Sequence, residues 1–185
     1  QEIEDLCVML LEQLPTSEFD LISNFSQKFP VKVISKIIGV PENMEQQLVK
    51  WSSNMVAMYQ ARRDSQIERK AVLATNQFSE YIKTLIKRKK HMPSEDLLSY
   101  IVNQNTLDKQ VSEEEIISTV ILLLNAGHEA TVHTISNGIK TILESQIKPE
   151  KMLENPKLLT DEVIRYTTPL HMFIRYCKIE GALCG

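Results

Sequence analysis

The most apolar stretch of the chain lies between Ser112 and Ser145. Ser112 is followed three residues later by Glu115, a capping box that predicts the start of a helix. Nearly every residue of 116–126 is apolar, so this part has no polar stripe, and we expect a helix buried inside a larger body. The apolar run is too short to cross a bilayer, which needs about 20 consecutive apolar residues. The pattern therefore predicts one long central helix and no membrane span.

Apolar residues at helical spacing predict further helices on both sides of the central one. Pro15 and Gly39 mark helix ends, and Asp64 and Ser94 are the expected N-caps of two later helices. The expected helices cover residues 1–14, 19–39 with an irregularity at Pro30, 41–59, 64–90, 94–102, 112–145, 149–154 and 158–166.

The pattern changes after Pro169. Residues 172–177 are rich in β-branched and aromatic side chains and predict a strand, and Gly181 and Gly185 bound a second one. The 185 residues are 43% hydrophobic and 24% charged, which is ordinary for a globular protein. Because repeats and linker-like tracts are missing from the sequence, we expect a single domain over residues 1–185, mainly α with a small β element at its C-terminal end.

Charge and cysteine content narrow the class of protein. A formal net charge of −3 lacks the excess of positive charge that is typical of nucleic-acid-binding proteins. Residues 87–90 form a basic run at the end of a predicted helix, where cations are favoured by the helix dipole. We favour a solvated helix end over the alternative of DNA binding. The three cysteines show no CxxC spacing, and an odd number without a disulfide pattern suits a reducing cytoplasm.

The central helix changes character around Gly127. Glycine in a helix interior costs about 1 kcal/mol relative to alanine, and close approach of another body is the usual reason for it. Glu129 and Thr131 are polar at a depth that the preceding run marks as buried, so they need partners or a chemical role. From this segment alone, a crossing of two helices with a polar patch is as well supported as a functional site.

Other chemistries fit this segment poorly. His128 and His133 are five residues apart, about 140° around a helix, whereas the zinc-protease motif needs two histidines four apart. Glu129 and His133 could form a pair, but the chain has no second Glu/His set for a di-iron bundle. A GxSxG elbow for a hydrolytic triad is missing from the sequence as well. The sequence therefore predicts no metal ligands.

Glu162 and Arg165 form a second constellation. They lie three residues apart, close enough for a charge-assisted pair on one helical face. Such a pair alone is usually a surface ion pair that contributes little. Its position gives it more weight, since it follows the central helix by one short helical segment and precedes Pro169, a predicted strand and Arg175.

Together these segments resemble a bacterial-type cytochrome P-450, a haem-thiolate monooxygenase. Residues 126–131, AGHEAT, resemble the oxygen-binding part of the long I helix of that family, and Glu162 with Arg165 resembles the ExxR of its K helix. Residues 169–175 resemble the strand that follows the K helix, and residues 37–41 the junction of helices E and F. The resemblance implies the helical domain of this family from helix D to helix K.

The resemblance also implies roles for individual residues. Ala126, Gly127 and Ala130 would lie against the haem, and Arg175 would pair with a haem propionate. Glu129 and Thr131 would be the catalytic residues, with Glu129 helping to deliver protons to bound oxygen through water. The implied protein is cytoplasmic, takes a small apolar substrate and receives electrons from a ferredoxin-type partner.

Two departures from the family pattern change the expected activity. Ala130 occupies the position where the family usually carries its proton-relay threonine, and Thr131 points about 100° away. Neither Cys177 nor Cys184 matches the thiolate ligand, whose glycine-rich loop is absent from the chain. We therefore expect a middle fragment that binds no haem stably and is not catalytic alone. The alternative is a non-catalytic helical interaction module derived from the same fold.

Overall fold

The structure is a computed structural model that describes residues 2–60, 63–104, 111–172 and 177. Its described part consists of helices and turns of helix, and none of it is in a strand. The α-helices are α1 (Glu2–Glu12), α2 (Lys28–Ile38), α3 (Glu45–Val56), α4 (Ser65–His91), α5 (Leu97–Asn103), α6 (Glu113–Glu144), α7 (Pro149–Glu154) and α8 (Pro156–Thr167). Three short helical turns are η1 (Ile22–Ser26), η2 (Glu42–Met44) and η3 (Ala57–Tyr59).

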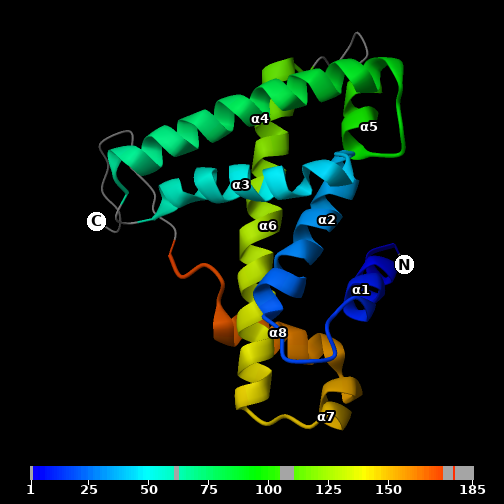
Figure 1. Ribbon diagram of the computed structural model, residues 1–185, viewed down its shortest axis with the longest axis vertical. Helices are drawn as coiled ribbons and strands as arrows, with labels where there is room; N and C mark the ends of the chain where they lie inside the picture. The colour runs from blue at the N-terminus through cyan, green and yellow to red at the C-terminus, as the bar shows by residue number, and fades with distance from the viewer. Residues whose placement is uncertain (1, 61–62, 105–110, 173–176, 178–185) are drawn as a thin grey trace, which may run out of the picture.

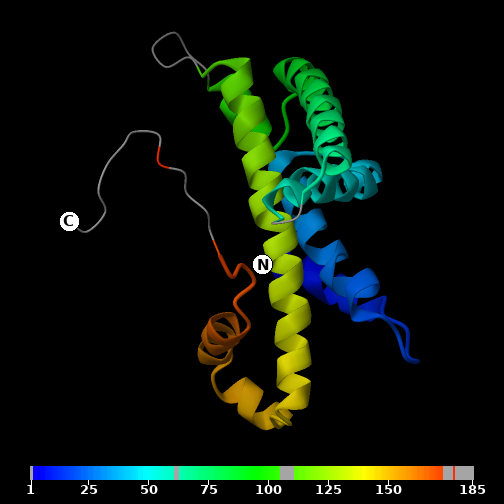
Figure 2. The same cartoon turned by 90° about the vertical axis from the view of Figure 1, so that its left-hand side faces the viewer.

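Helix α6 runs through the length of the molecule, and the other helices are arranged around it (Figure 1). Helices α3 and α4 lie side by side across its N-terminal half, and α2 packs along its middle. Helix α8 folds back against its C-terminal half, on the opposite side from α1 and α2 (Figure 2). In the described ranges, no helix is both long enough and apolar enough to cross a membrane.

The starts of α4 and α6 have the capping hydrogen bonds that the sequence predicts. The hydroxyl of Ser112 accepts a hydrogen bond from the Glu115 backbone N–H at 3.2 Å, and the Glu115 carboxylate accepts one from the Ser112 N–H at 2.8 Å. Asp64 caps α4 by accepting hydrogen bonds from the backbone N–H groups of Gln66 and Ile67. The capping box and the Asp64 cap are therefore confirmed.

The apolar core lies between α6 and the layer formed by α2, α3, α4 and α5. Leu48 of α3, Phe78 of α4 and Leu124 of α6 are completely buried. The Trp51 ring packs against the rings of Phe78 and Tyr81, with centroid distances of 5.4 and 5.7 Å. Helices α7 and α8 contribute no buried residue within the described chain, so they are attached to the domain rather than part of its core.

The region before α2 differs from the expectation of an irregularity at Pro30. The irregularity comes earlier, as the π-helical turn η1, in which the Gln27 N–H donates to the Ile22 carbonyl at 3.0 Å. Pro30 lies in the first turn of α2, where the missing N–H has no partner to lose. Gly39 ends α2 with φ of +85°, as predicted for a C-terminal glycine.

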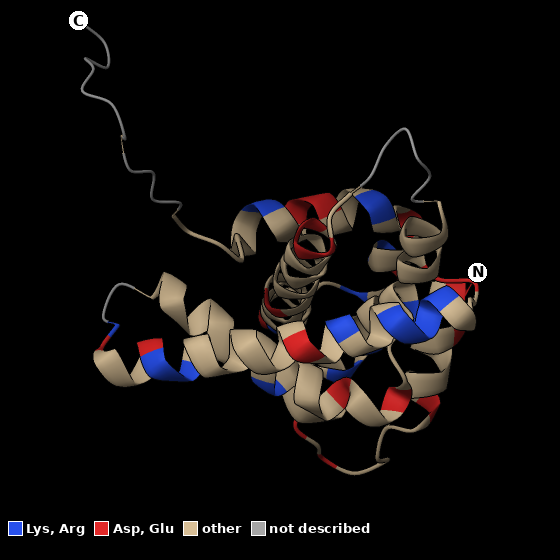
Figure 3. Cartoon of the chain, turned by 90° about the horizontal axis from the view of Figure 1, so that it is seen from above, with Lys and Arg blue, Asp and Glu red and all other residues tan. Residues whose placement is uncertain are grey.

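The expected cap at Ser94 is wrong. Asp96 caps α5 by accepting a hydrogen bond from the Ser99 N–H at 2.7 Å, and the Ser94 hydroxyl donates to Asp96 instead. The expectation of a solvated basic run is also wrong at one position, since Lys89 is buried and paired with Asp96. The other basic residues at this end of α4 are exposed, where Lys and Arg gather next to α5 (Figure 3).

The predicted C-terminal strands fall mostly on residues outside those that the structure describes. Residues 173–176 and 178–185 are among these, so the second strand is not tested. Met172 and Cys177, at the two ends of the first expected strand, lie outside regular structure. The described structure is therefore helical throughout, and the expected small β element is not part of it.

Candidate functional site

One exposed stripe runs along α6, and its chemistry changes along its length. We define the α6 stripe by exposed positions three or four residues apart, which share one face of a helix. Its two ends are polar, with Glu115 and Thr119 before the middle and His133 and Asn137 after it. Its middle is apolar and consists of Leu122, Ala126 and the half-buried Ala130. Leu122 is 65% exposed, although it is one of the larger apolar residues of the helix.

Gly127 lies next to this stripe but faces α2. A Cβ atom added at Gly127 would lie 2.7 Å from the Cδ1 atom of Ile34, too close for two carbon atoms. A larger residue here would require Ile34 to shift, so α2 and α6 approach each other closely at Gly127, which is the helix crossing that the sequence left open as an alternative. Ala126, one residue earlier, is exposed on the stripe. The segment thus combines a close helix contact with an open apolar face.

The polar residues predicted for this site lie at its edge. Glu129 and Thr131 are half-buried, and in the described chain no ion pair joins Glu129 to His133. Thr134, which the sequence did not single out, donates a hydrogen bond from its hydroxyl to the Ala130 carbonyl at 2.8 Å. Such a bond from a threonine to the preceding turn often bends a helix. The spacing of four residues between Ala130 and Thr134 could have predicted this hydrogen bond from the sequence.

Glu162 and Arg165 form the predicted pair on α8. The guanidinium donates to the carboxylate through Nε at 2.7 Å and Nη2 at 2.6 Å, so the pair is bidentate. The hydrogen bond from Arg165 lowers the pKa of Glu162, and the same contact raises the pKa of Arg165. Both side chains are exposed, at 55% for Glu162 and 69% for Arg165. The pair is confirmed, and it lies on the surface.

Helix α8 is held against α6 through a second glycine. A Cβ atom at Gly138 would lie 2.6 Å from the Cγ1 atom of Val163, so a larger residue at this position would require Val163 to shift. Val163 follows Glu162 directly, and the contact therefore fixes where the ion pair sits relative to α6. In the sequence, Gly138 stands out only as a glycine inside a predicted helix, which does not indicate what it contacts.

Arg175, the predicted partner of a haem propionate, lies outside the described residues, so its predicted role is not tested. In the ranges that the structure describes, no three His, Cys, Asp or Glu side chains come together as a ligand set for a metal ion.

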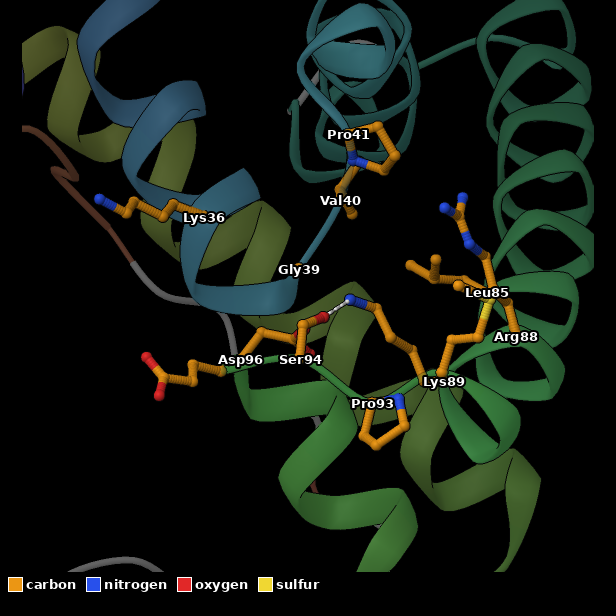
Figure 4. A pocket seen from close by; sticks show the side chains of 12 residues that line it. Lys36, Gly39, Val40, Pro41, Leu85, Arg88, Lys89, Pro93, Ser94 and Asp96 are labelled. Carbon is orange, nitrogen blue, oxygen red and sulfur yellow. Dashed lines mark hydrogen bonds and ion pairs between the residues drawn. The ribbon is translucent and has the colours of Figure 1, made fainter.

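A buried polar cluster lies away from the α6 stripe and was not predicted. The ammonium of Lys89 lies 2.5 Å from the Asp96 carboxylate, which also accepts hydrogen bonds from the hydroxyls of Ser94 and Ser99. This cluster lines a cavity of about 460 Å³ between the ends of α2 and α4 and the start of α5 (Figure 4). Because none of the residues that line the cavity belongs to α6, the cavity is separate from the candidate site.

Comparison with known proteins identifies the family. The family model of cytochrome P450 matches residues 1–173. The chain is 33% identical over 180 residues to the biotin biosynthesis cytochrome P450 of Bacillus subtilis (strain 168), covering 95% of this chain and 45% of that protein. It is 31% identical to the vitamin D(3) 25-hydroxylase of Pseudonocardia autotrophica, covering 91% of this chain and 41% of that protein.

Solved structures agree with this assignment. The crystal structure of P450BioI in complex with an acyl carrier protein ligated to hexadec-9Z-enoic acid matches with a TM-score of 0.81 and 32% identity, covering 89% of this chain and 44% of that chain. The bacillaene polyketide synthase cytochrome P450 PksS of Bacillus subtilis 168 matches with a TM-score of 0.77 and 27% identity, covering 91% and 43%. The chain spans less than half the length of these relatives. It belongs to the cytochrome P450 family.

Proposed function

We propose that the apolar middle of the α6 stripe forms one wall of the haem site of a P450 monooxygenase. The observation that carries this proposal is the change along the stripe, which is polar at both ends and apolar only at Leu122, Ala126 and Ala130. An exposed apolar face of this kind marks a surface that another body covers. The two alanine side chains are small, so a flat ring can lie against the helix there. The residues present therefore fit haem, the cofactor of the family.

The polar residues beside this wall would handle protons. Haem, when bound, supplies the activation of molecular oxygen. Glu129 stands at the edge of the apolar middle, where its carboxylate can accept and release protons through water, and Thr131 is the nearest threonine in sequence. Because Ala130 has no hydroxyl, the relay would depend on Glu129 more than in most of the family. We assign Arg175 to a haem propionate.

The Glu162–Arg165 pair would have a structural role rather than a catalytic one. Val163 anchors α8 on Gly138, and the bidentate geometry holds the guanidinium and the carboxylate in one orientation. Such a pair presents two fixed charged groups to whatever packs on that surface of α8. We propose that this surface meets other parts of a complete P450 rather than solvent.

The substrate and partners follow from the family and its relatives. We propose a small apolar substrate and a ferredoxin-type electron donor in the cytoplasm. The solved relative that carries a fatty acid on an acyl carrier protein supports an acyl chain as one substrate class. We further propose that this chain alone is not catalytic, since neither Cys177 nor Cys184 matches the thiolate position.

The alternative of a non-catalytic interaction module has one observation in its favour. Helix α1 exposes several large apolar side chains, which a partner could cover. These are Ile3, Val8, Met9 and Leu11. A module of this kind would not need an apolar stripe in the middle of α6, and this is where the two functions differ.

Haem incorporation into a chimera tests the proposed function. The matching segment of the Bacillus subtilis biotin biosynthesis P450 is replaced by this chain, and haem per protein is measured for the chimera and two variants. We expect Ala126→Glu to lower haem content at least tenfold, because a carboxylate would be buried against the ring, a cost of about 1.4 kcal/mol or more.

Asn137→Glu is the matched control, because Asn137 is exposed on the same stripe beyond its apolar middle. This variant is expected to keep its haem content. Equal loss of haem in both variants, with circular dichroism showing that both are folded, would contradict the assignment of the α6 stripe.

A further inference from the structure

His128 is the most completely buried ionisable side chain of α6. It is 1% exposed, and no side chain of the described residues forms a hydrogen bond with its ring nitrogens. Its neighbour Gly127 lies where α6 closely approaches Ile34 of α2. A neutral imidazole without a side-chain partner is already unfavourable in such a place, and a charged one is far more so.

The segment that faces α6 here is the π-helical turn η1 and the start of α2. Burial lowers the pKa of His128, a hydrogen bond between its ring and the backbone of Gln27, between η1 and α2, raises that pKa by less, and the charge of His133 adds to the lowering. Gln27 therefore lies close to the ring. Because η1 contacts α6 directly, the side chain of His128 is enclosed between a turn of unusual geometry and a tight helix crossing.

Among the described residues, no charged side chain forms a hydrogen bond with the ring of His128. Asp20 precedes η1, and its carboxylate accepts a hydrogen bond from the Ile22 N–H. Lys28 begins α2 and has the same sign of charge as a protonated histidine. Lys32, one turn later, is held by Glu45 of α3 at 3.1 Å. A protonated His128 would thus meet no carboxylate already directed at it.

Glu129 and His133 are the charged groups on α6 itself. Glu129 follows His128 and lies about 100° away around the helix, toward the stripe. His133 is exposed, and its charge disfavours a second positive charge on His128. Protonation of His128 therefore adds a charge that neither side of the contact neutralises.

We propose that the contact between His128 and the η1–α2 segment is a pH-sensitive switch that is closed when the imidazole is neutral. On protonation the ring would leave its enclosed position for water and release η1 from α6 next to Glu129. Release of η1 would uncover the half-turn of α6 that carries Glu129 and Thr131. This device belongs to the chain itself and does not depend on the proposed function.

The pH window follows from the direction of the shift. The pKa of His128 in the folded state lies below its value in the unfolded state, about 6.5. Folding is therefore most favoured above about pH 6.5, and this stability is lost as the pH falls toward the folded-state pKa. Between the two pKa values, the unfolding equilibrium constant rises by up to about tenfold per pH unit.

Urea unfolding of the full 185-residue chain between pH 5 and pH 8 tests the switch. The chain, His128→Phe and the control His133→Phe are compared at each pH. We expect the chain and His133→Phe to show the rise in the unfolding constant below pH 6.5, because His133 is exposed. We expect His128→Phe to lose most of that rise, because phenylalanine fills the site without titrating.

Titration of the histidine ring protons by NMR supplies a measurement that needs no variant. A His128 ring that stays neutral well below pH 6.5 supports the switch. The proposal is overturned if His128 titrates at its ordinary value, if His128→Phe keeps the full pH dependence, or if the chain is not folded at pH 8, where the neutral ring should be enclosed.

Discussion

Two ion pairs with nearly the same contact distance occupy opposite environments in this protein. Lys89 and Asp96 approach to 2.5 Å and are only 10% and 4% exposed, whereas Arg165 and Glu162 approach to 2.6 Å and are more than half exposed. Burying two charges is costly unless both are fully paired, while an exposed pair contributes little in water. The comparison indicates that the Lys89–Asp96 pair stabilises the fold of this chain, whereas the Arg165–Glu162 pair lies on its surface and contributes little to that stability.

The buried pair joins three helices. Asp96 caps the start of α5, Lys89 lies in the last turn of α4, and Gly39 caps the end of α2. A side chain at Gly39 would overlap the Asp96 carboxylate, so the end of α2 rests directly on the pair (Figure 4). Removal of one partner should therefore affect the whole layer of α2, α4 and α5, whereas removal of the exposed pair should affect α8 alone.

The largest effect is expected from Asp96→Ala. This substitution leaves the Lys89 ammonium buried without its carboxylate and removes the cap of α5. Breaking a buried pair in this way costs about 3–5 kcal/mol of unfolding free energy. Urea unfolding followed by circular dichroism at neutral pH measures the change.

Lys89→Met is the matched control for this prediction. The Asp96 carboxylate would keep its hydrogen bonds from the Ser94 hydroxyl, the Ser99 hydroxyl and the Ser99 N–H, so we expect a smaller loss than in Asp96→Ala. Equal or larger loss in Lys89→Met would contradict the view that Asp96 organises the cluster.

A smaller loss of folding stability is expected when the pH is lowered far enough to protonate Asp96. Burial alone would raise the pKa of Asp96, but hydrogen bonds from Lys89, from the Ser99 backbone and from Ser94 hold that pKa below its usual range. Because the folded-state pKa lies below the unfolded-state value of about 3.9, the pair stabilises the fold above about pH 4. That stability is lost as the pH falls through the folded-state pKa.

Urea midpoints between pH 2 and pH 6 measure this loss. Asp96→Asn should show a flatter profile below pH 4 than the unchanged chain, because its amide does not titrate. Parallel profiles for the two proteins would show that other carboxylates cause the acid loss.

The smallest effect on stability is expected from Arg165→Ala. Both partners of this pair are exposed, so the midpoint of urea unfolding should stay unchanged within error. In the chimera with the Bacillus subtilis relative, the same substitution should lower haem content if the surface of α8 meets other parts of the P450. A loss of stability in the isolated chain would show that the pair already acts within it.

Most helices were predictable because their signals are local. The Ser112 and Glu115 box, the Asp64 cap and the proline at the start of α7 each act within one turn of chain. The ExxR pair was predictable for the same reason, since residues three apart meet on any helix. Local chemistry thus gave the element order, and the joint pattern of two motifs gave the family.

The rest depends on contacts between distant segments. Ser94 and Asp96 are both good caps, and only the position of Lys89 on α4 decides that Asp96 takes this role. The burial of Lys89 itself required α5 to fold over it, which no spacing in the basic run indicates. Likewise, the helical phase alone did not show that Gly127 faces Ile34 of α2.

The reduced, carbon monoxide-bound spectrum of the chimera with the Bacillus subtilis biotin biosynthesis P450 tests the central claim most directly. If the α6 stripe of this chain forms a wall of the haem site, the chimera will bind haem and give the Soret band of a thiolate-ligated carbon monoxide complex. A folded chimera that takes up no haem, while the unchanged relative does, would contradict the claim and favour the interaction module.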